Sequence, residues 1–285
     1  MDEFKKNLKQ STGMRVFIYL MALLVCSLIG GAIAALFTLE NDILMIKIGQ
    51  GISSALMFIV PPILLYIITR TQPMRELGFR KPGEGWMLLI GIVLMFSSLP
   101  LTNLLGERNE KVNFGEFLES FLKLLEDTAA DLTQRMLEVD TIGGLLFNLL
   151  VIALIPAIGE ELTFRGVLQQ ALTKRCNVHV AVWLSAFIFS FIHFQFYGFL
   201  PRLFLGLVLG YLFYYSGSLW STIIMHFVNN GTVVVVAFLN HKGITDVDIE
   251  HFGSTSNVFL LIASLIVTVG LIWFVSKKQY KYGRE

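Results

Sequence analysis

Long apolar runs are the feature that most constrains what this chain can fold into. A helix that crosses a bilayer needs about 20 mostly apolar residues. Eight stretches of the 285-residue chain fit or approach that requirement: 16–39, 43–69, 86–105, a run from near 142 through Pro156 into charged residues, 178–197, 203–215, 219–239 and 258–275. Only 15% of the residues are charged, too few to cover the surface of a soluble protein of this size. The sequence therefore predicts an all-α, polytopic transmembrane bundle of about eight spans.

Prolines and glycines mark where these spans bend, end and pack. Pro61 and Pro62 predict a kink within the second span. The short Ser216-Gly217-Ser218 segment predicts a turn between the sixth and seventh spans. Gly206-x-x-x-Gly210 predicts close packing of the sixth span against a neighbouring helix.

Lysine and arginine placement predicts the orientation of the bundle. If the N-terminus is cytoplasmic, 15 of the 22 basic residues fall in cytoplasmic segments, and 14 of the 21 acidic residues fall outside. An even number of spans places both termini on one side. We therefore expect a multi-pass protein of the plasma membrane with both termini in the cytoplasm. The net charge of +1 gives no reason to expect a nucleic-acid partner.

The chain divides into two functional regions in this interpretation. Residues 1–141 form a scaffold of three spans and the long connection 107–141, and residues 142–285 form a catalytic transmembrane core with the final span and a basic tail. Apolar residues recur at helical spacing in 107–141 among nine acidic ones. This pattern predicts amphipathic helices on the membrane surface, and a lid or substrate-recruiting element is the alternative.

Ionisable and polar side chains within the spans concentrate in the second region. Such residues are costly in a bilayer, and by default they indicate function. The candidates lie on the fourth, fifth and seventh spans: Glu160, Glu161, Arg165, His193, His226 and Asn230.

Spacing within the fourth span suggests different tasks for its two glutamates. Glu161 and Arg165 are four residues apart, with the acid first, which favours an ion pair. Glu160 points about 100° around the helix and is left for chemistry. It lies 16 residues before Cys176 in the predicted turn, and His193 lies 17 residues after it. We therefore expect Glu160 and His193 at similar depth, placed to share a water molecule.

The seventh span offers two polar groups on one face. His226 and Asn230 are four residues apart and could both donate hydrogen bonds to one developing oxyanion. The alternative is a zinc site in which Glu160, His193 and His226 are the ligands.

These residues also carry a resemblance to a known family. The chain contains Glu160-Glu161-x-x-x-Arg165, Phe189-x-x-x-His193 and His226-x-x-x-Asn230, in that order and on separate predicted spans. This resembles the three motifs of the CPBP family, the CAAX-protease and bacteriocin-processing intramembrane endopeptidases, also called the Abi or type II CAAX prenyl endopeptidase family. The resemblance covers roughly residues 142–240, about a third of the chain.

The resemblance implies an intramembrane endopeptidase. Glu160 and His193 would activate the hydrolytic water, and His226 and Asn230 would stabilise the oxyanion. Glu161 and Arg165, with Phe189, would hold the shape of the site. The family has been described both as metalloproteases and as metal-free glutamate proteases, and spacing is compatible with both. Asparagine is an uncommon zinc ligand but a good oxyanion donor, which favours the metal-free mechanism without a cofactor.

The candidate site must be open to a substrate. A peptide must reach the site, so we expect a polar cavity among the fourth to seventh spans, open to the cytoplasm. Prenylated and bacteriocin-like peptides are both compatible substrates. A proton- or ion-coupled transporter is one alternative, although no inverted repeat supports it. A non-hydrolytic immunity or binding protein is the other.

Overall fold

All regular structure in the described part of the chain is helical. The computed structural model describes residues 12–39, 42–69, 76–80, 86–248 and 252–278. Among these described residues, seven helices are long and apolar enough to cross a membrane: Gly13–Leu39, Ile43–Thr69, Trp86–Asn109, Ile142–Thr173, Phe196–Ser216, Leu219–His241 and Val258–Lys277. Val178–Phe191 is a shorter apolar helix. The predicted all-α polytopic bundle is confirmed, with one of the eight expected spans too short to cross alone.

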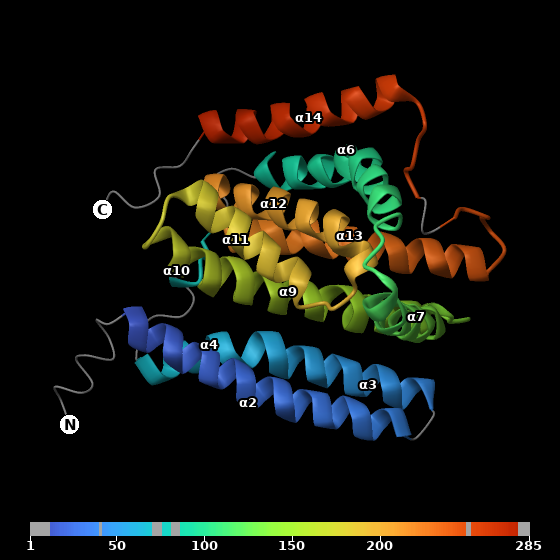
Figure 1. Cartoon of the computed structure of the whole chain (residues 1–285), viewed down its shortest axis with the longest axis horizontal. Coiled ribbons are helices and arrows are strands. Elements are labelled where there is room, and N and C mark those ends of the chain that lie inside the picture. The colour runs from blue at the N-terminus through green and yellow to red at the C-terminus, as the bar shows by residue number, and fades with distance from the viewer. Residues whose placement is uncertain (1–11, 40–41, 70–75, 81–85, 249–251, 279–285) are drawn as a thin grey trace.

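The helices form three layers (Figure 1). The first layer holds α2 (Thr12–Leu39), α3 (Ile43–Ser54) and α4 (Val60–Thr69), and the third holds α6 (Trp86–Asn109) and α14 (Val258–Lys277). The middle layer holds the rest of the bundle, including α11 (Val178–Phe191), α12 (Phe199–Ser216) and α13 (Leu219–His241). Helix α2 begins and α14 ends at the same end of the bundle (Figure 1).

One long helix of the middle layer carries the acidic motif. It is assembled from α8 (Ile142–Asn148), the π-helical η2 (Leu149–Leu154), α9 (Ile155–Glu161), the π-helical η3 (Leu162–Gln169) and α10 (Gln170–Thr173). Glu160 and Glu161 therefore lie within a continuous helix, well before its end. The π-helical turns widen the backbone on both sides of α9, and such turns are often found at functional sites.

The first layer shapes this helix directly. A π-helical segment, η1 (Ala55–Ile59), precedes Pro61 and Pro62, where a kink is expected from the sequence. Proline lacks the N–H that continues an α-helical ladder, so the preceding turn opens. The Phe58 carbonyl there accepts a hydrogen bond from Thr163 Oγ1 at 3.0 Å. A Cβ on Gly159 would lie 2.7 Å from Phe58 Cβ, so only glycine allows this close approach.

Helix α11 is shorter than the sequence predicts. The expected span 178–197 ends as a helix at Phe191, because Phe194 adopts a positive φ of 54° and the chain turns. Helix α12 then starts at Phe199, four residues before the predicted start. The turn at Gly217 is confirmed, since its φ of 64° is a left-handed conformation that glycine adopts without strain.

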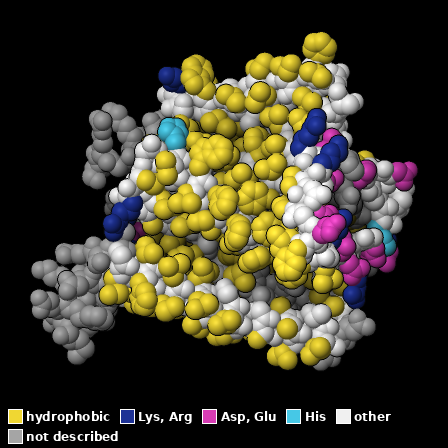
Figure 2. Space-filling model, in the orientation of Figure 1, with side chains coloured by type: hydrophobic (Ala, Val, Ile, Leu, Met, Phe, Trp, Pro, Cys, Tyr) yellow, Lys and Arg dark blue, Asp and Glu magenta, His cyan; other side chains and the backbone are white. Residues whose placement is uncertain are grey.

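Helix α7 (Glu116–Leu137) closes one end of the bundle and runs across the other helices (Figure 1). Apolar side chains cover the middle of the molecule, and acidic ones gather at the end where α7 lies (Figure 2). Phe117, 92% exposed, and Phe121 face outward from α7, while Leu122 is buried. The structure thus has one helix within 107–141, and its place on the membrane surface stays a prediction. Helix α6 also runs to Asn109, four residues beyond the predicted end of its span.

Candidate active site

A buried ion pair organises the acidic motif. Arg165 Nη1 lies 2.7 Å from Glu161 Oε1, and the two side chains are 1% and 0% exposed. Arg165 Nη2 donates a second hydrogen bond, at 2.9 Å, to the Gly206 carbonyl of α12. The expected pairing of these residues is therefore present. The planar guanidinium fork joins the acidic motif to α12, which a lysine could not do with the same geometry.

His226 is the second partner of Glu161. Its Nδ1 lies 3.0 Å from Glu161 Oε1, the same oxygen that Arg165 contacts. A carboxylate that pairs with arginine has no proton to donate, so Nδ1 of His226 is the donor in this bond. The ring is thereby oriented, and its other nitrogen, Nε2, lies 3.7 Å from Glu160 Oε2.

Glu160 occupies a different environment from its neighbour. Its side chain is 10% exposed, and it faces His226 Nε2 while the hydrogen bonds of Arg165 go to Glu161 and Gly206. The two glutamates therefore differ in environment, as the helix geometry predicts. Glu161 lies inside the ion-paired cluster, and Glu160 lies at its edge.

His193 does not lie on a helix. It sits two residues beyond the end of α11, in the turn that precedes α12. The expectation that the fifth span carries it as a helical residue is wrong, because the chain leaves the helix at Ile192. Its Nδ1 lies 2.7 Å from the Phe189 carbonyl, so Nδ1 donates and Nε2 is free to accept. His193 interacts electrostatically with Glu160 and His226, so the turn keeps it near both.

Phe189 is the residue around which the three motifs pack. Its ring makes edge-on contacts with the rings of His193 and His226, at centroid distances of 5.2 and 6.0 Å. The guanidinium carbon of Arg165 lies 5.0 Å from the centroid of the same ring. Phe189 is 2% exposed, so it excludes water from the inner side of the cluster.

Asn230 lies one helical turn beyond His226 on α13. It is half-buried, and its Oδ1 accepts a hydrogen bond from Asn229 Nδ2 at 3.1 Å. This bond leaves the Asn230 amide nitrogen for another partner and fixes which end of the side chain is the donor. The role of Asn230 toward an oxyanion stays a prediction.

The side chains named as zinc ligands do not form a ligand set in this geometry. Within the described residues, no three His, Cys, Asp or Glu side chains are arranged to hold a metal ion. Glu160, His193 and His226 therefore do not fit a three-ligand zinc centre as placed.

Arg202 is a residue near the site that falls between the predicted spans 178–197 and 203–215. It lies in the first turns of α12, where its Nη1 and Nη2 donate to the Gln195 side-chain oxygen and carbonyl. A Cβ on Gly198 would lie 2.7 Å from Nη1 of Arg202, so glycine gives the guanidinium room. Arg202 interacts electrostatically with Glu160. A single arginine beside an apolar run gives no sequence signal for this position.

Comparisons with known proteins identify the same part of the chain. Residues 142–232 match a family model described as type II CAAX prenyl endopeptidase Rce1-like. The chain is 27% identical over 188 residues to the putative membrane peptidase YdiL of Bacillus subtilis (strain 168), an alignment that covers 66% of this chain and 72% of that protein. No solved structure matches the chain. The matched segment contains every residue of the three motifs.

Proposed function

We propose a catalytic mechanism for this chain, which is a membrane-embedded peptidase of the CAAX-protease type. The family match and the relative's name favour a protease over the alternatives of a transporter and a non-hydrolytic immunity protein. The chain acts in the bilayer on a peptide substrate, and Glu160 is the group that activates the hydrolytic water.

The observation that carries this proposal is the separation of the two glutamates. Glu161 is bonded to Arg165 and His226. Glu160 lies farther from its neighbour, with its Oε2 at 3.7 Å from His226 Nε2. A general base must exchange a proton during the reaction. A carboxylate committed to an arginine is a poor base, so Glu160 is the member suited to this role.

The reaction proceeds by direct attack of water. Glu160 takes a proton from a water molecule that also donates to Nε2 of His193, and the water oxygen forms a bond to the scissile carbonyl carbon. The proton then passes from Glu160 to the leaving nitrogen as the C–N bond breaks. The products are a carboxylic acid and an amine, and transfer of the acid proton to the amine leaves a carboxylate and an ammonium group.

His226 and Asn230 stabilise the developing oxyanion. In this proposal His226 acts through Nε2, because the hydrogen bond from its Nδ1 to Glu161 orients the ring with Nε2 toward Glu160. The Asn230 amide is the second donor, one turn away.

The test is a Glu160→Gln variant of the full chain in proteoliposomes. The probes are a farnesylated CAAX peptide, its unprenylated form and a bacteriocin-leader peptide, because all three substrate classes agree with the proposal. We expect cleavage to fall by about 10²- to 10⁴-fold, the contribution typical of a general base. The exposed Glu138→Gln variant is the matched control and should keep its rate. Wild-type cleavage by Glu160→Gln would contradict the assignment, and ion flux without cleavage would favour transport.

The orientation in the membrane belongs to the same proposal. We place both termini in the cytoplasm and the chain in the plasma membrane, on the basis of the basic residues counted in the sequence. The peptide would then enter from the cytoplasmic side.

A further inference from the structure

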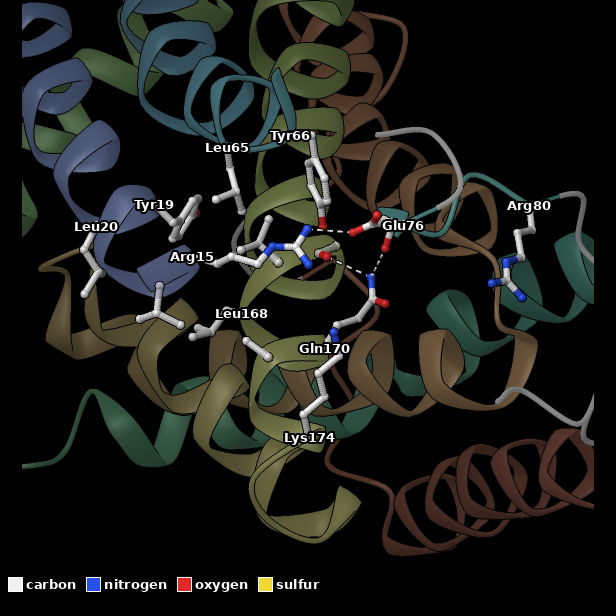
Figure 3. A pocket seen from close by; sticks show the side chains of 14 residues that line it. Arg15, Tyr19, Leu20, Leu65, Tyr66, Glu76, Arg80, Leu168, Gln170 and Lys174 are labelled. Atoms are coloured by element: carbon white, nitrogen blue, oxygen red, sulfur yellow. Dashed lines mark hydrogen bonds and ion pairs between the residues drawn. The ribbon is translucent and has the colours of Figure 1, made fainter. Parts of the chain in front are cut away.

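The cavity visible in Figure 3 is separate from the three motifs. It has a volume of about 610 Å³, and its walls come from α2, α4, the segment 76–80, η3 and α10. None of the motif residues lines it. The polar cavity expected among the fourth to seventh spans is therefore a different feature and stays a prediction. The feature that bears directly on the motifs is the turn between α11 and α12, which carries His193.

The turn 192–198 has a conformation that its own sequence does not favour. Phe194, the neighbour of His193, has a φ of 54°, a left-handed conformation that is costly for a bulky side chain. Strain of this kind persists only where the surrounding structure holds it. At the near end α11 does so, since the His193 amide donates to the Ser190 carbonyl at 3.4 Å. The position of His193 therefore depends on what holds the far end.

The far end of the turn is the start of α12, where backbone N–H groups need partners. The first N–H groups of a helix have no partner within it, and a capping side chain usually accepts from them. Gly198, the residue before α12, has no side chain for this task. The Phe199 amide donates to the Phe196 carbonyl, and Pro201 has no N–H. Between these two residues, the Leu200 amide is left to find an acceptor elsewhere.

Asn109, the last residue of α6, supplies that acceptor. Its side-chain Oδ1 accepts from the Leu200 amide at 2.6 Å, and its Nδ2 donates to the Phe196 carbonyl at 2.8 Å. Asn109 is 2% exposed, so water does not compete for either bond. Asparagine is among the preferred helix caps, and here the cap comes from a residue 91 positions away. This contact accounts for the start of α12 at Phe199, four residues before the predicted start.

We propose that Asn109 is a positioning residue for the peptidase reaction, because it caps α12 from the end of α6 and so sets where His193 lies relative to Glu160. This role rests on the function proposed above, in which Nε2 of His193 accepts a hydrogen bond from the attacking water. Without Asn109, the strain at Phe194 can relax as α11 continues along the apolar run, and His193 moves with the backbone. A misplacement of about 1 Å can cost about 10²-fold in rate.

The test variant is Asn109→Leu of the full chain in proteoliposomes, with the peptides used for Glu160→Gln. Leucine is similar in size to asparagine and removes both hydrogen bonds. The matched control is Asn103→Leu, because Asn103 also lies on α6 and its Nδ2 donates to the distant Phe252 carbonyl at 2.8 Å. We expect kcat of Asn109→Leu to fall about 10- to 100-fold with KM close to the wild-type value. A wild-type kcat, or an equal fall in Asn103→Leu, would overturn the proposal.

A His193→Ala background separates positioning from a loss of folded protein. If Asn109 acts through His193, Asn109→Leu should cause no further fall in rate once the imidazole is absent. A variant that only lowers the folded fraction would reduce the rate by the same factor in both backgrounds, and that result would overturn the proposal.

Amide hydrogen exchange tests the turn without any substrate. In Asn109→Leu, peptides covering 192–203 should exchange faster, because the Leu200 amide loses its acceptor, while α13 should keep its wild-type protection. Unchanged exchange at the turn, or faster exchange throughout the chain, would overturn the positioning role. Wild-type cleavage by His193→Ala with faster exchange at the turn would overturn the proposed function of His193 while supporting Asn109 as the residue that fixes the turn, so the two proposals can fail separately.

Discussion

At the scale of single residues, one oxygen of Glu161 links the first and third motifs, those of Arg165 and His226. Its Oε1 receives Arg165 and His226 at 2.7 and 3.0 Å, and the three side chains are almost fully buried. A charge buried in this way depends on its partner, because neither water nor another cation can replace it. The cluster should therefore respond sharply to the loss of any one member.

Replacing Arg165 tests this dependence. Arg165→Met leaves the buried Glu161 without its arginine partner, and we expect a loss of about 3–5 kcal/mol in the free energy of unfolding. Arg165→Lys keeps the charge but loses one of the two directed bonds, so it should lose about 1.5–3 kcal/mol. Unfolding in detergent measures both, with the exposed Arg175→Met as control. Equal stability of Arg165→Met and wild type would contradict this account of the pair.

Helical periodicity made much of this cluster predictable. The four-residue spacing of Glu161 and Arg165 predicts their bond, because neighbours on one helix face need no knowledge of the fold. Contacts between helices are different. The bond between His226 and Glu161 joins residues 65 positions apart, and the part played by Arg202 depends on where α12 begins. The sequence offers no periodic signal for either.

At the scale of helices, close packing depends on a few glycines. A Cβ on Gly206 would lie 3.0 Å from Ala186 Cβ and 3.2 Å from a ring carbon of Phe189. Gly210 is similarly tight, with Val182 Cγ1 at 2.9 Å. The Gly-x-x-x-Gly spacing therefore lets α12 pack closely against α11, as the sequence predicts. This packing also holds Phe189 of α11 in place.

Gly206→Ala should disturb this packing. We expect a loss of about 1–3 kcal/mol in stability, typical of overpacking, and a further loss of peptidase activity because Phe189 must move. Gly270→Ala is the control, since a Cβ there meets nothing within 4 Å. Thermal unfolding and cleavage are measured on the same samples. A Gly206→Ala chain with wild-type stability and activity would show that α11 and α12 adjust without cost.

Helix α7 should dock in a pH-dependent way. Burial raises the pKa of the Glu126 carboxyl, and the nearby Arg202 offsets only part of this rise. Glu126 Oε2 also accepts a hydrogen bond from the Tyr197 amide at 3.3 Å. The folded state thus holds the proton more tightly than the unfolded state, whose pKa is about 4.3. The stabilisation is complete below that value and is lost as pH rises through the raised one.

Unfolding measured across this pH range tests the effect. Glu126→Gln should lack the part of the pH dependence that the carboxyl supplies, and the difference from wild type should grow as pH rises. The exposed Glu138→Gln should keep the wild-type profile. Identical profiles for wild type and Glu126→Gln would mean that the docking of α7 does not depend on this proton.

At the scale of the whole molecule, the number and order of helices follow from hydropathy, but their exact ends do not. In the part of the chain that the structure describes, seven spans lie where long apolar runs predict them. The error at α11 arises because Ile192, Phe194 and Phe196 continue the apolar run beyond the helix. Hydropathy reports the environment of a residue, whereas the end of α11 is decided by backbone geometry at Phe194.

The native cysteines can test the predicted orientation. Cys26 is buried, whereas Cys176 is half-buried in the turn after α10. A membrane-impermeant maleimide should label Cys176 only after cells are permeabilised. In a Cys176→Ser background, the exposed Asp246→Cys should be labelled in intact cells. Labelling of Cys176 in intact cells would show that the chain has the opposite orientation.

The short α11 also has a consequence for how the chain is made. Its 14 residues reach about 21 Å, less than the hydrocarbon thickness of about 30 Å. When only α11 has emerged during translation, the segment is therefore too short to insert stably in the bilayer by itself. We expect α11 to stay in the insertion machinery until α12 emerges, so that the two helices insert together as a hairpin. Chains truncated near residue 198 should be degraded during synthesis.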